Sequence, residues 1–428
     1  MTALAHGMFG LILGVTILAG AVGAARAATI DVPAGGDLQQ AIDKAASGDV
    51  LYLAGGIHAG SVKVDKPLTL DGPDDRSAIV DGGGQGRSIW ITAPDVIIRH
   101  LTVRGSGLSL FDMDAAVFLD RTADRGQIEE NNIFNNLIGI YVWGPKDGLV
   151  RANRIVGRTD LRRSERGNGV QLWRTPGTRV IDNVISAGRD GIFTMTSKQN
   201  LFRGNHFEDV RFAVHYMYTN DSEVSDNTSV GNDIGYAIMY SNNLVIRNNV
   251  SDGAKDHGLL FNFANGSEIV GNVVRGGDKC VFIYNANKNR FSDNQFEDCR
   301  IGVHFTAGSE RNTITQNAFV GNQTQVMYVG TRFLDWSEND RGNYWSDNSA
   351  FDLDGDGIAD TAYRPNGVID QVLWRAPAAK MLLNSPAVQV VRWAQSQFPA
   401  VHPGGVVDMA PLMTAPVVSA AQRLAARP

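Results

Sequence analysis

Evenly spaced methionines and two histidines in the middle of the chain form a set that could bind a soft metal ion. The candidate ligands are Met195, His215, Met217, Met239, His304 and Met327. The first three methionines are 22 residues apart, and one histidine lies two residues before the second of them. Thioether sulfur and imidazole nitrogen together select Cu(I) over hard cations. The pattern predicts a Cu(I) site, and the open alternative is that these methionines fill gaps beneath a covering loop or partner.

A second set of candidate ligands lies in the acidic stretch DLDGDGIAD. Its carboxylates are Asp352, Asp354, Asp356 and Asp360. They occupy positions 1, 3, 5 and 9, which suits Ca²⁺, and Gly357 allows a sharp turn. An EF-hand carries a bidentate Glu at position 12, where this chain has Tyr363. We expect a structural Ca²⁺ on a truncated loop, and the alternative is a plain Asp/Gly turn.

The elements that must position these residues are revealed by an asparagine repeat. The asparagines are Asn131, Asn153, Asn183, Asn205, Asn227, Asn249, Asn272, Asn294 and Asn317. The steps between them are 22, 30, 22, 22, 22, 23, 22 and 23 residues, and Asn339 falls 22 residues further on. A fixed period of this length is typical of a repeat architecture.

The repeat predicts strands rather than helices. Each unit is rich in Val, Ile, Phe, Asn and Gly with alternating apolar residues, and it is too short for a pair of helices. We therefore predict an all-β fold, a right-handed parallel β-helix whose coils stack about 4.8 Å apart. A short amphipathic helix over Asp37–Ala46 would cap its open N-terminal end.

Alignment of the coils predicts which side chains face outward, because strand side chains alternate. One outward column contains Tyr141, Gln171, Phe193, His215, Ala237, Leu260, Phe282, His304 and Met327. The other contains Trp143, Trp173, Met195, Met217, Met239, Asn262, Tyr284, Thr306 and Val329. Both columns are aromatic and thioether-rich and hold no carboxylate, which indicates a binding surface or a strip covered by another segment.

Two long connections border the tryptophan end of this strip. The stretch from Arg158 to Gly167 supplies the extra residues of the 30-residue step and carries four arginines. It either docks an acidic partner or is a solvated loop. Together with Ser106–Asp114 it is expected to wall the strip at one end.

Charge and the N-terminus bound the compartment and the partners. The chain has 428 residues and a formal charge of −6, so no basic face suggests nucleic-acid binding. Residues 1–27 resemble a secretory signal peptide, the alternative being an uncleaved anchor. Residues 28–340 would form the β-helix and 341–428 a C-terminal extension. Cys280 and Cys299 are expected to be free thiols, because extended geometry places them too far apart for a bridge.

The C-terminal extension contains one further predicted helix, Ser385–Phe398. Ser385 is a favourable N-cap, and Pro386 suits the first helical position. Val388, Val391, Ala394 and Phe398 would share one face of it. This helix either docks on a membrane partner or covers the last coil.

Parallel β-helices often act on polysaccharides, but the strip lacks the residues for that chemistry. Hydrolysis needs paired carboxylates across the scissile bond, and neither outward column supplies them. Tryptophans can stack on sugars, so carbohydrate binding or modification remains the alternative function.

Several C-terminal motifs resemble the NosD family, the periplasmic maturation proteins of nitrous-oxide reductase. The matching pieces are Asn343–Trp345 followed by DLDGDG, Tyr363–Pro365, Leu373–Trp374, Ser385–Val388, Arg392–Ala394, Asp408–Met413 and the stretch SERGNGVQLW. The resemblance covers the whole mature chain.

The resemblance implies a non-enzymatic periplasmic role in building the copper centres of nitrous-oxide reductase. The implied partners are an ABC transporter, made of a membrane permease and a cytoplasmic ATPase, a copper-carrying lipoprotein that hands over Cu(I), and the reductase as client.

Overall fold

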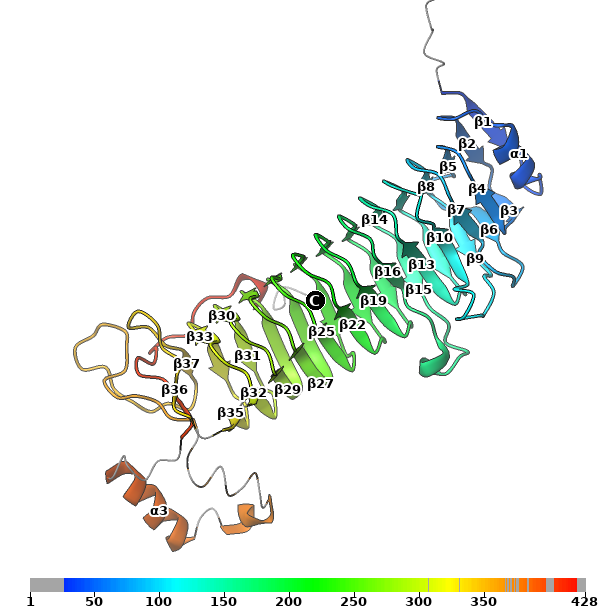
Figure 1. The fold of residues 1–428 in the computed structure, drawn as a ribbon. Helices are drawn as coiled ribbons and strands as arrows, with labels where there is room; N and C mark the ends of the chain where they lie inside the picture. Colours follow the sequence, from blue (N-terminus) through cyan, green and yellow to red (C-terminus); the bar gives the residue numbers. More distant parts are fainter. Residues whose placement is uncertain are drawn as a thin grey trace, which may run out of the picture.

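The computed structural model is an elongated solenoid of stacked coils (Figure 1). It describes residues 27–306, 308–330, 332–365, 367, 369, 372, 374, 377–382, 385–397 and 404–421. All strand pairings between successive coils are parallel, so the predicted all-β parallel β-helix is confirmed. Residues 1–26 of the predicted signal peptide lie outside the described residues.

A short helix covers the N-terminal end of the solenoid, as the sequence predicts. Helix α1 spans Leu38–Lys44, and the Asp37 side chain caps it by accepting a hydrogen bond from the Gln40 backbone N–H at 2.9 Å. Leu38 and Ile42 are buried against the first coils. The helix therefore hides the edge that the first coil would otherwise expose.

One side of the solenoid is a 13-stranded parallel sheet, here called sheet A. Its strands, in order, are β1 (Thr29–Val32), β2 (Val50–Leu53), β5 (Thr69–Asp71), β8 (Ile97–Arg99), β11 (Gln127–Glu129), β14 (Leu149–Arg151), β17 (Arg179–Ile181), β20 (Leu201–Arg203), β23 (Glu223–Ser225), β26 (Val245–Arg247), β28 (Glu268–Val270), β30 (Arg290–Ser292) and β33 (Thr313–Thr315).

The other two sides form the short ladder and the long ladder. The short ladder contains β3 (Gly56–Ala59), β6 (Ala78–Asp81), β9 (Thr102–Arg104), β12 (Asn132–Phe134), β15 (Arg154–Val156), β18 (Val184–Ser186), β21 (His206–Glu208), β24 (Thr228–Val230), β31 (Gln295–Glu297), β34 (Ala318–Val320) and β37 (Tyr344–Trp345). The long ladder contains β4 (Val62–Val64), β7 (Ile89–Ile91), β10 (Ala115–Leu119), β13 (Ile138–Trp143), β16 (Val170–Trp173), β19 (Asp190–Met195), β22 (Phe212–Met217), β25 (Ile234–Met239), β32 (Ile301–Thr306) and β35 (Thr324–Val329). Strands β27 (Val250–Asn262) and β29 (Val273–Tyr284) run through both ladders.

The repeated asparagines form a buried hydrogen-bonded ladder inside the turns. Asn131, for example, donates its backbone and its side-chain N–H to Oδ1 of Asn153, each at 3.0 Å. Each coil thereby satisfies polar groups of its neighbour that would be costly to bury unpaired. Asn343, not Asn339, closes the series, since Asn317 bonds to Asn343. The prediction was wrong there because the last step is 26 residues rather than 22.

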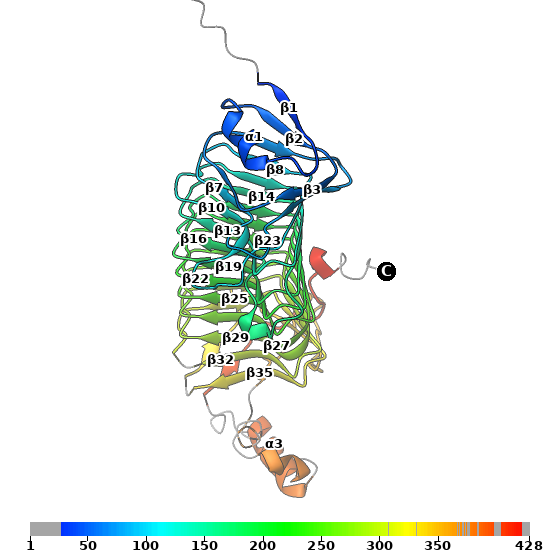
Figure 2. The same cartoon turned by 90° about the vertical axis from the view of Figure 1, so that its right-hand side faces the viewer.

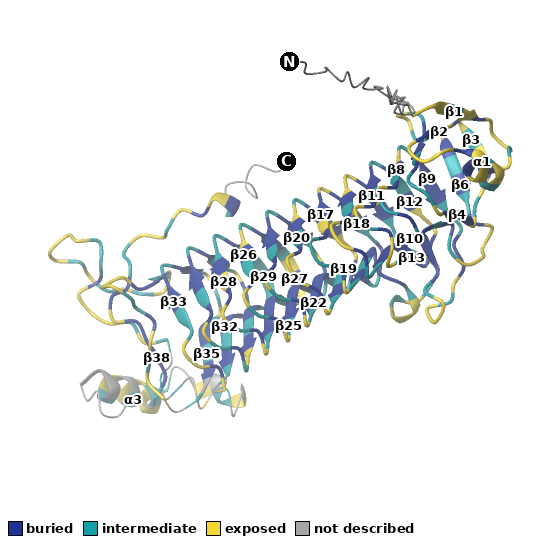
Figure 3. Cartoon of the chain, turned by 45° about the horizontal axis from the view of Figure 1, so that its top comes forward, coloured by how far each residue is buried: buried dark blue, intermediate teal, exposed yellow. Residues whose placement is uncertain are grey.

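The interior is filled by one continuous apolar core, which Figure 3 shows as the dark blue inward side of the strands. The core also contains a disulfide between Cys280 and Cys299, with Cα atoms 5.7 Å apart. The expectation of free thiols is therefore wrong. Strict alternation placed Cys280 outward, but it lies at the corner within β29, where its side chain turns inward and is fully buried. The turn before β32 brings Cys299 to the same corner.

The C-terminal end of the stack is closed by the returning chain. Strand β36 (Leu334–Asp335) pairs with β38 (Val406–Val407). The buried Asp408 then accepts hydrogen bonds from the Asn343 backbone at 2.7 Å and the Trp345 indole at 2.8 Å. Burial raises the pKa of Asp408, and these hydrogen bonds oppose part of that rise.

The helices of the extension lie beyond that closed end. They are η2 (Pro377–Leu382) and α3 (Pro386–Gln397), and both views show α3 away from the coils (Figures 1 and 2). The predicted helix is confirmed, and Ser385 Oγ accepts from the Val388 backbone N–H at 3.4 Å. The closing segment around Asp408, rather than α3, covers the last coil.

Candidate functional site

The candidate site is the outward face of the long ladder, here called the strip. The register pairs its residues as the sequence alignment predicts. Met217 pairs with Met195 on one neighbouring coil and with Met239 on the other. His304 pairs directly with Met327. The backbone therefore brings the methionines together on successive coils, with His215 beside them.

The outward side chains pack into small clusters of their own, separate from the main core. One cluster at the N-terminal end includes Phe118, Tyr141, Trp143 and Trp173. Another, in the middle, contains Ala237 and Leu260 with the partly buried Met239. The strip is thus an apolar surface outside the core, as its composition predicts.

A buried carboxylate orients His215. Its Nδ1 lies 3.0 Å from Oδ2 of Asp190, and Arg211 donates two hydrogen bonds of 2.8 Å to the same carboxylate. Burial alone would raise the pKa of Asp190, but the hydrogen bonds from His215 and Arg211 outweigh it and lower the pKa. An ionised carboxylate only accepts, so Nδ1 must donate, and neutral His215 keeps its lone pair on Nε2.

That second nitrogen of His215 is available for a ligand. Nε2 is buried and has no hydrogen-bond partner among the described residues, and His215 is only 9% exposed. Phe193 and Phe212 flank the ring with centroids 5.0 and 4.9 Å away. The small Ala237 occupies the paired position on the next coil. A buried acceptor without a partner is costly, which makes this atom the strongest metal-ligand candidate of the strip.

His304 has different surroundings. Its Nδ1 is also buried without a partner among the described residues, and Phe282 lies 4.9 Å away. Burial, followed by the positive charge of Lys279, lowers the pKa of His304 to about 4. The imidazole is therefore neutral at pH 7, as a metal ligand must be, but a cation stands beside it.

Sequence reasoning missed a third outward column, which precedes the other two. Its members are Asp190, Phe212, Ile234, His257, Lys279 and Ile301. The expectation that the outward positions hold no carboxylate is wrong for this column, because Asp190 lies in it. The signal was present, since the column needs only one more aligned position before the corner. Strict alternation hid it, because the corner residue turns inward.

The arginine-rich insertion is neither a free docking loop nor a simply solvated one. It contains the short helix η1 (Arg163–Glu165). Arg163 bonds to Asp233 at 2.7 Å and to Asp209 at 3.0 Å. Leu161 from this loop and Met113 from the other long connection pack on the N-terminal cluster. Both loops therefore wall that end of the strip, and the insertion's charges are used within the chain.

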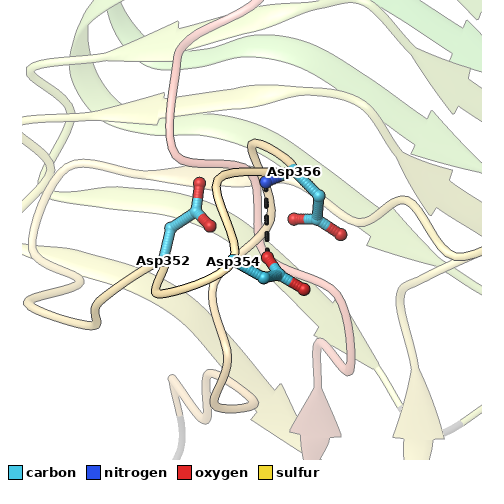
Figure 4. A group of neighbouring side chains, drawn as sticks. All are labelled: Asp352, Asp354 and Asp356. Atoms are coloured by element: carbon cyan, nitrogen blue, oxygen red, sulfur yellow. Dashed lines mark hydrogen bonds between the residues drawn. The ribbon is translucent and has the colours of Figure 1, made fainter.

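The acidic loop keeps three of its four predicted ligands together. Oxygens of Asp352, Asp354 and Asp356 lie within 4.8 Å of one another (Figure 4). The Gly357 backbone N–H, which donates to Asp352 at 2.9 Å, is the main cause of the lowered pKa of that carboxyl group. Asp360 is not in this group and instead accepts from the Leu353 backbone at 2.9 Å.

The fold and the strip define a parallel β-solenoid protein with an outward face of aromatic, imidazole and thioether groups. A family model described as "Periplasmic copper-binding protein (NosD)" matches residues 151–350. The chain is 40% identical over 379 residues to the "Probable ABC transporter binding protein NosD" of Stutzerimonas stutzeri, covering 85% of this chain and 86% of that one. It belongs to the NosD family.

Two further similarities agree with this assignment. The Pseudomonas aeruginosa protein of the same name is 37% identical and covers 85% of this chain and 88% of its own. A solved tailspike, the Dettilon protein gp208, superposes with a TM-score of 0.54 at 14% identity over 68% of this chain and 63% of its own. At that identity the tailspike supports the fold alone. Among the described residues, no helix is long and apolar enough to cross a membrane.

Proposed function

We propose that this chain is a non-enzymatic periplasmic scaffold that holds Cu(I) transiently on the strip during assembly of the copper centres of nitrous-oxide reductase. One observation carries the copper part of the proposal. His215 is fixed by Asp190 through Nδ1, and its buried Nε2 has no partner among the described residues. The family description as copper-binding supports the same reading.

The chemistry follows from the donor set. Neutral imidazole and thioether are soft ligands that favour Cu(I). A carboxylate on the far nitrogen of a ligating histidine fixes its orientation and raises its basicity. Met195, Met217 and Met239 repeat the same donor at intervals of about 4.8 Å. A ladder of similar donors lets the ion move between neighbouring sites without a deep trap, which suits a cargo that must be handed on.

Anaerobic Cu(I) titration against a chromogenic chelator tests this proposal. We expect His215→Ala and Met217→Ala each to weaken binding by about tenfold or more. His206→Ala on the short ladder and Met409→Ala in the closing segment are matched controls that should bind as the parent chain does. Unaltered affinity in His215→Ala, Met217→Ala and the His304→Ala/Met327→Ala double variant would refute the copper proposal.

The proposed partners are those of a copper-assembly system. They are an ABC transporter permease with its ATPase, a copper-carrying lipoprotein and the reductase. The relatives' name, "ABC transporter binding protein", supports the first of these. We further propose that residues 1–27 act as the export signal. The permease would then be met on the periplasmic side of the inner membrane.

The C-terminal helix is our candidate contact to the permease. Val390 and Trp393 on α3 are 61% and 62% exposed, which is unusual for large apolar side chains of a helix. Deleting everything after residue 365 would also remove the cap at Asp408, so the sharper test is Val390→Ser/Trp393→Ser. Unchanged co-purification with the permease in this variant would refute the contact, and Val417→Ser, an exposed apolar control outside α3, should have no effect.

We also propose that the acidic loop binds a structural Ca²⁺. The support is the convergence of three carboxylates, which are hard oxygen ligands. Calorimetric titration should show binding that is lost in Asp352→Asn/Asp356→Asn and kept in Asp335→Asn. Absence of Ca²⁺ binding by the parent chain would show that the loop is only an Asp/Gly turn.

The strip's ring geometry weighs against the carbohydrate alternative. Sugars stack on free ring faces, but Trp143 and Trp173 stack on each other with centroids 5.6 Å apart and planes 15° apart. Arg121 and Arg174 lie over these two rings at 4.1 and 4.5 Å. Little indole face is left for a sugar.

A further inference from the structure

One border of the strip carries an unusual row of exposed side chains, here called the turn edge. It consists of the residues that directly follow the tryptophan and methionine column, namely Gly144, Arg174, Thr196, Tyr218, Tyr240 and Phe263, with Arg121 packed against Gly144. Backbone N–H groups of this row bond to the next coil, as from Tyr218 to Met239 and from Tyr240 to Asn262. The row therefore runs parallel to the strip and next to it.

Every member from Gly144 to Phe263 has a left-handed backbone. The φ angles of Tyr218, Tyr240 and Phe263 are 50°, 49° and 52°. Gly, Asn and Asp tolerate this region, whereas bulky residues there are outliers that cost on the order of 1–3 kcal/mol each. Among the described residues these three are the only Phe, Tyr or Trp with a positive φ. The chain accepts this strain at one place only, beside the strip.

The three rings are exposed and ordered. They are 48%, 38% and 40% exposed, and they stack with centroids 5.0 and 5.1 Å apart. Each pair is worth roughly 0.5–1.5 kcal/mol beyond area burial, which offsets only part of the backbone strain. Because the faces of Tyr240 are occupied by its neighbours, the row presents ring edges and hydroxyl groups outward.

At the other end of the row, two arginines are held ready for anions. Arg121 and Arg174 lie flat on Trp143 and Trp173, and such stacking leaves the in-plane N–H donors free to bond. Neither guanidinium forms an ion pair with a carboxylate in the described part of the chain. Gly144 lies between them, where a Cβ atom would approach Arg121 Cγ to 2.8 Å. The two arginines are thus about 10 Å apart, two coils at about 4.8 Å each.

We infer that the turn edge is the docking surface for the protein that receives copper from the strip, the apo-reductase, through an acidic patch on Arg121 and Arg174 and an apolar ridge along Tyr218–Phe263. The inference rests on the proposed copper function for the identity of the partner. Arg, Tyr and Trp are the residues that dominate protein interfaces. A row of six coils, about 29 Å long, matches a globular partner better than a small molecule. Its direct contact with the methionine column places the partner beside the copper donors.

The test measures binding of the purified mature chain to apo-reductase without copper, by biolayer interferometry at two salt concentrations. We expect Arg121→Gln/Arg174→Gln to raise Kd about tenfold and to flatten its salt dependence. Arg179→Gln/Arg203→Gln, two exposed arginines on sheet A, is the matched control and should leave Kd unchanged.

A second variant separates docking from structure. Tyr218→Asn/Tyr240→Asn places a residue that tolerates the left-handed region at both positions, so the melting temperature should stay the same or rise. Binding should nevertheless weaken at least about tenfold. A lowered melting temperature with unchanged Kd would show that the rings are only structural and would overturn the inference. Tyr52→Asn on sheet A is the control.

The outcomes also separate this inference from the copper proposal. Both double variants should bind Cu(I) as the parent chain does. Apo-reductase binding that depends on the turn edge, in a chain that binds no Cu(I), would leave docking intact and remove the copper proposal. If the copper-carrying lipoprotein or a second copy of this chain, rather than the reductase, depends on these residues, the assigned partner is wrong.

Discussion

Two histidines of the strip, His215 and His304, occupy equivalent places in the repeat but opposite electrostatic surroundings. Each stacks on a phenylalanine of the preceding coil, Phe193 or Phe282, with centroids 5.0 and 4.9 Å away. The residue 25 positions before each histidine differs. It is Asp190 for the first and Lys279 for the second.

This one difference in the third column changes what each imidazole can do. The carboxylate turns Nδ1 of His215 into a donor and leaves Nε2 open, and its negative charge favours a bound cation. The ammonium of Lys279, together with burial, keeps His304 neutral with a pKa of about 4, and its positive charge opposes a bound cation. The comparison teaches that the fold supplies two similar cradles, and that a neighbouring coil decides which of them favours copper.

The largest effect we expect concerns rigidity rather than metal. The disulfide Cys280–Cys299 lies in the His304 half, next to Lys279. Cys280→Ser/Cys299→Ser should lower the free energy of unfolding by about 3 kcal/mol. Amide hydrogen exchange should increase in β29–β32 and stay slow in β19–β25, because a solenoid coil contacts mainly its neighbours. Uniform loss of protection along the solenoid would contradict this picture of separate halves.

The second prediction removes the charge that favours His215. Asp190→Asn keeps the shape but loses the carboxylate, so Cu(I) affinity should fall about 10- to 100-fold. Long-range ¹H–¹⁵N spectra of the copper-free chain should show Nδ1–H on His215 in the parent and a mixed tautomer in the variant. Asp233→Asn, which alters an ion-paired carboxylate away from any imidazole, is the control. An unchanged tautomer with unchanged affinity would show that Asp190 has only a structural role.

Much of the site was predictable because the repeat fixes the register. The 22-residue spacing of Met195, Met217 and Met239 was enough to place them on paired positions of adjacent coils. Parallel strands stack one residue on one residue, so a sequence period translates directly into spatial neighbours.

What the repeat could not predict lies at the corners. Alternation fails where the chain turns between ladders, and this hid the outward Asp190 and the inward Cys280 alike. The internal use of the Arg163 charge was also hidden, since its partner Asp233 is 70 residues away on another coil. Such long-range pairs leave no local signal in the sequence.

The third prediction brings the two histidines closer together. Lys279→Met removes the cation beside His304, so the pKa of His304 should rise, because that charge is the second cause of its depression after burial. Cu(I) binding that is lost in His304→Ala/Met327→Ala should become a few-fold stronger in Lys279→Met, a modest effect because charges near the surface are screened. Lys198→Met, at an exposed turn, serves as the control. Weaker binding in Lys279→Met would show that the cation does not oppose the metal.

The smallest effect is on pH stability, and it depends on the direction of the His304 shift. The folded pKa is about 4, below the ordinary value of 6.5, so the unfolded chain binds more protons between these two pH values. The stability that neutral His304 allows is present above pH 6.5 and is lost as the pH falls toward 4. His304→Gln should therefore flatten the fall in urea midpoint between pH 7 and pH 4.5, whereas His206→Gln on the short ladder should leave it unchanged. His257, whose pKa burial also lowers, adds to the same window, so the His257→Gln/His304→Gln chain should be the flattest. If neither variant flattens the profile, His304 is not neutral by burial, and the contrast with His215 must lie in ligand geometry alone.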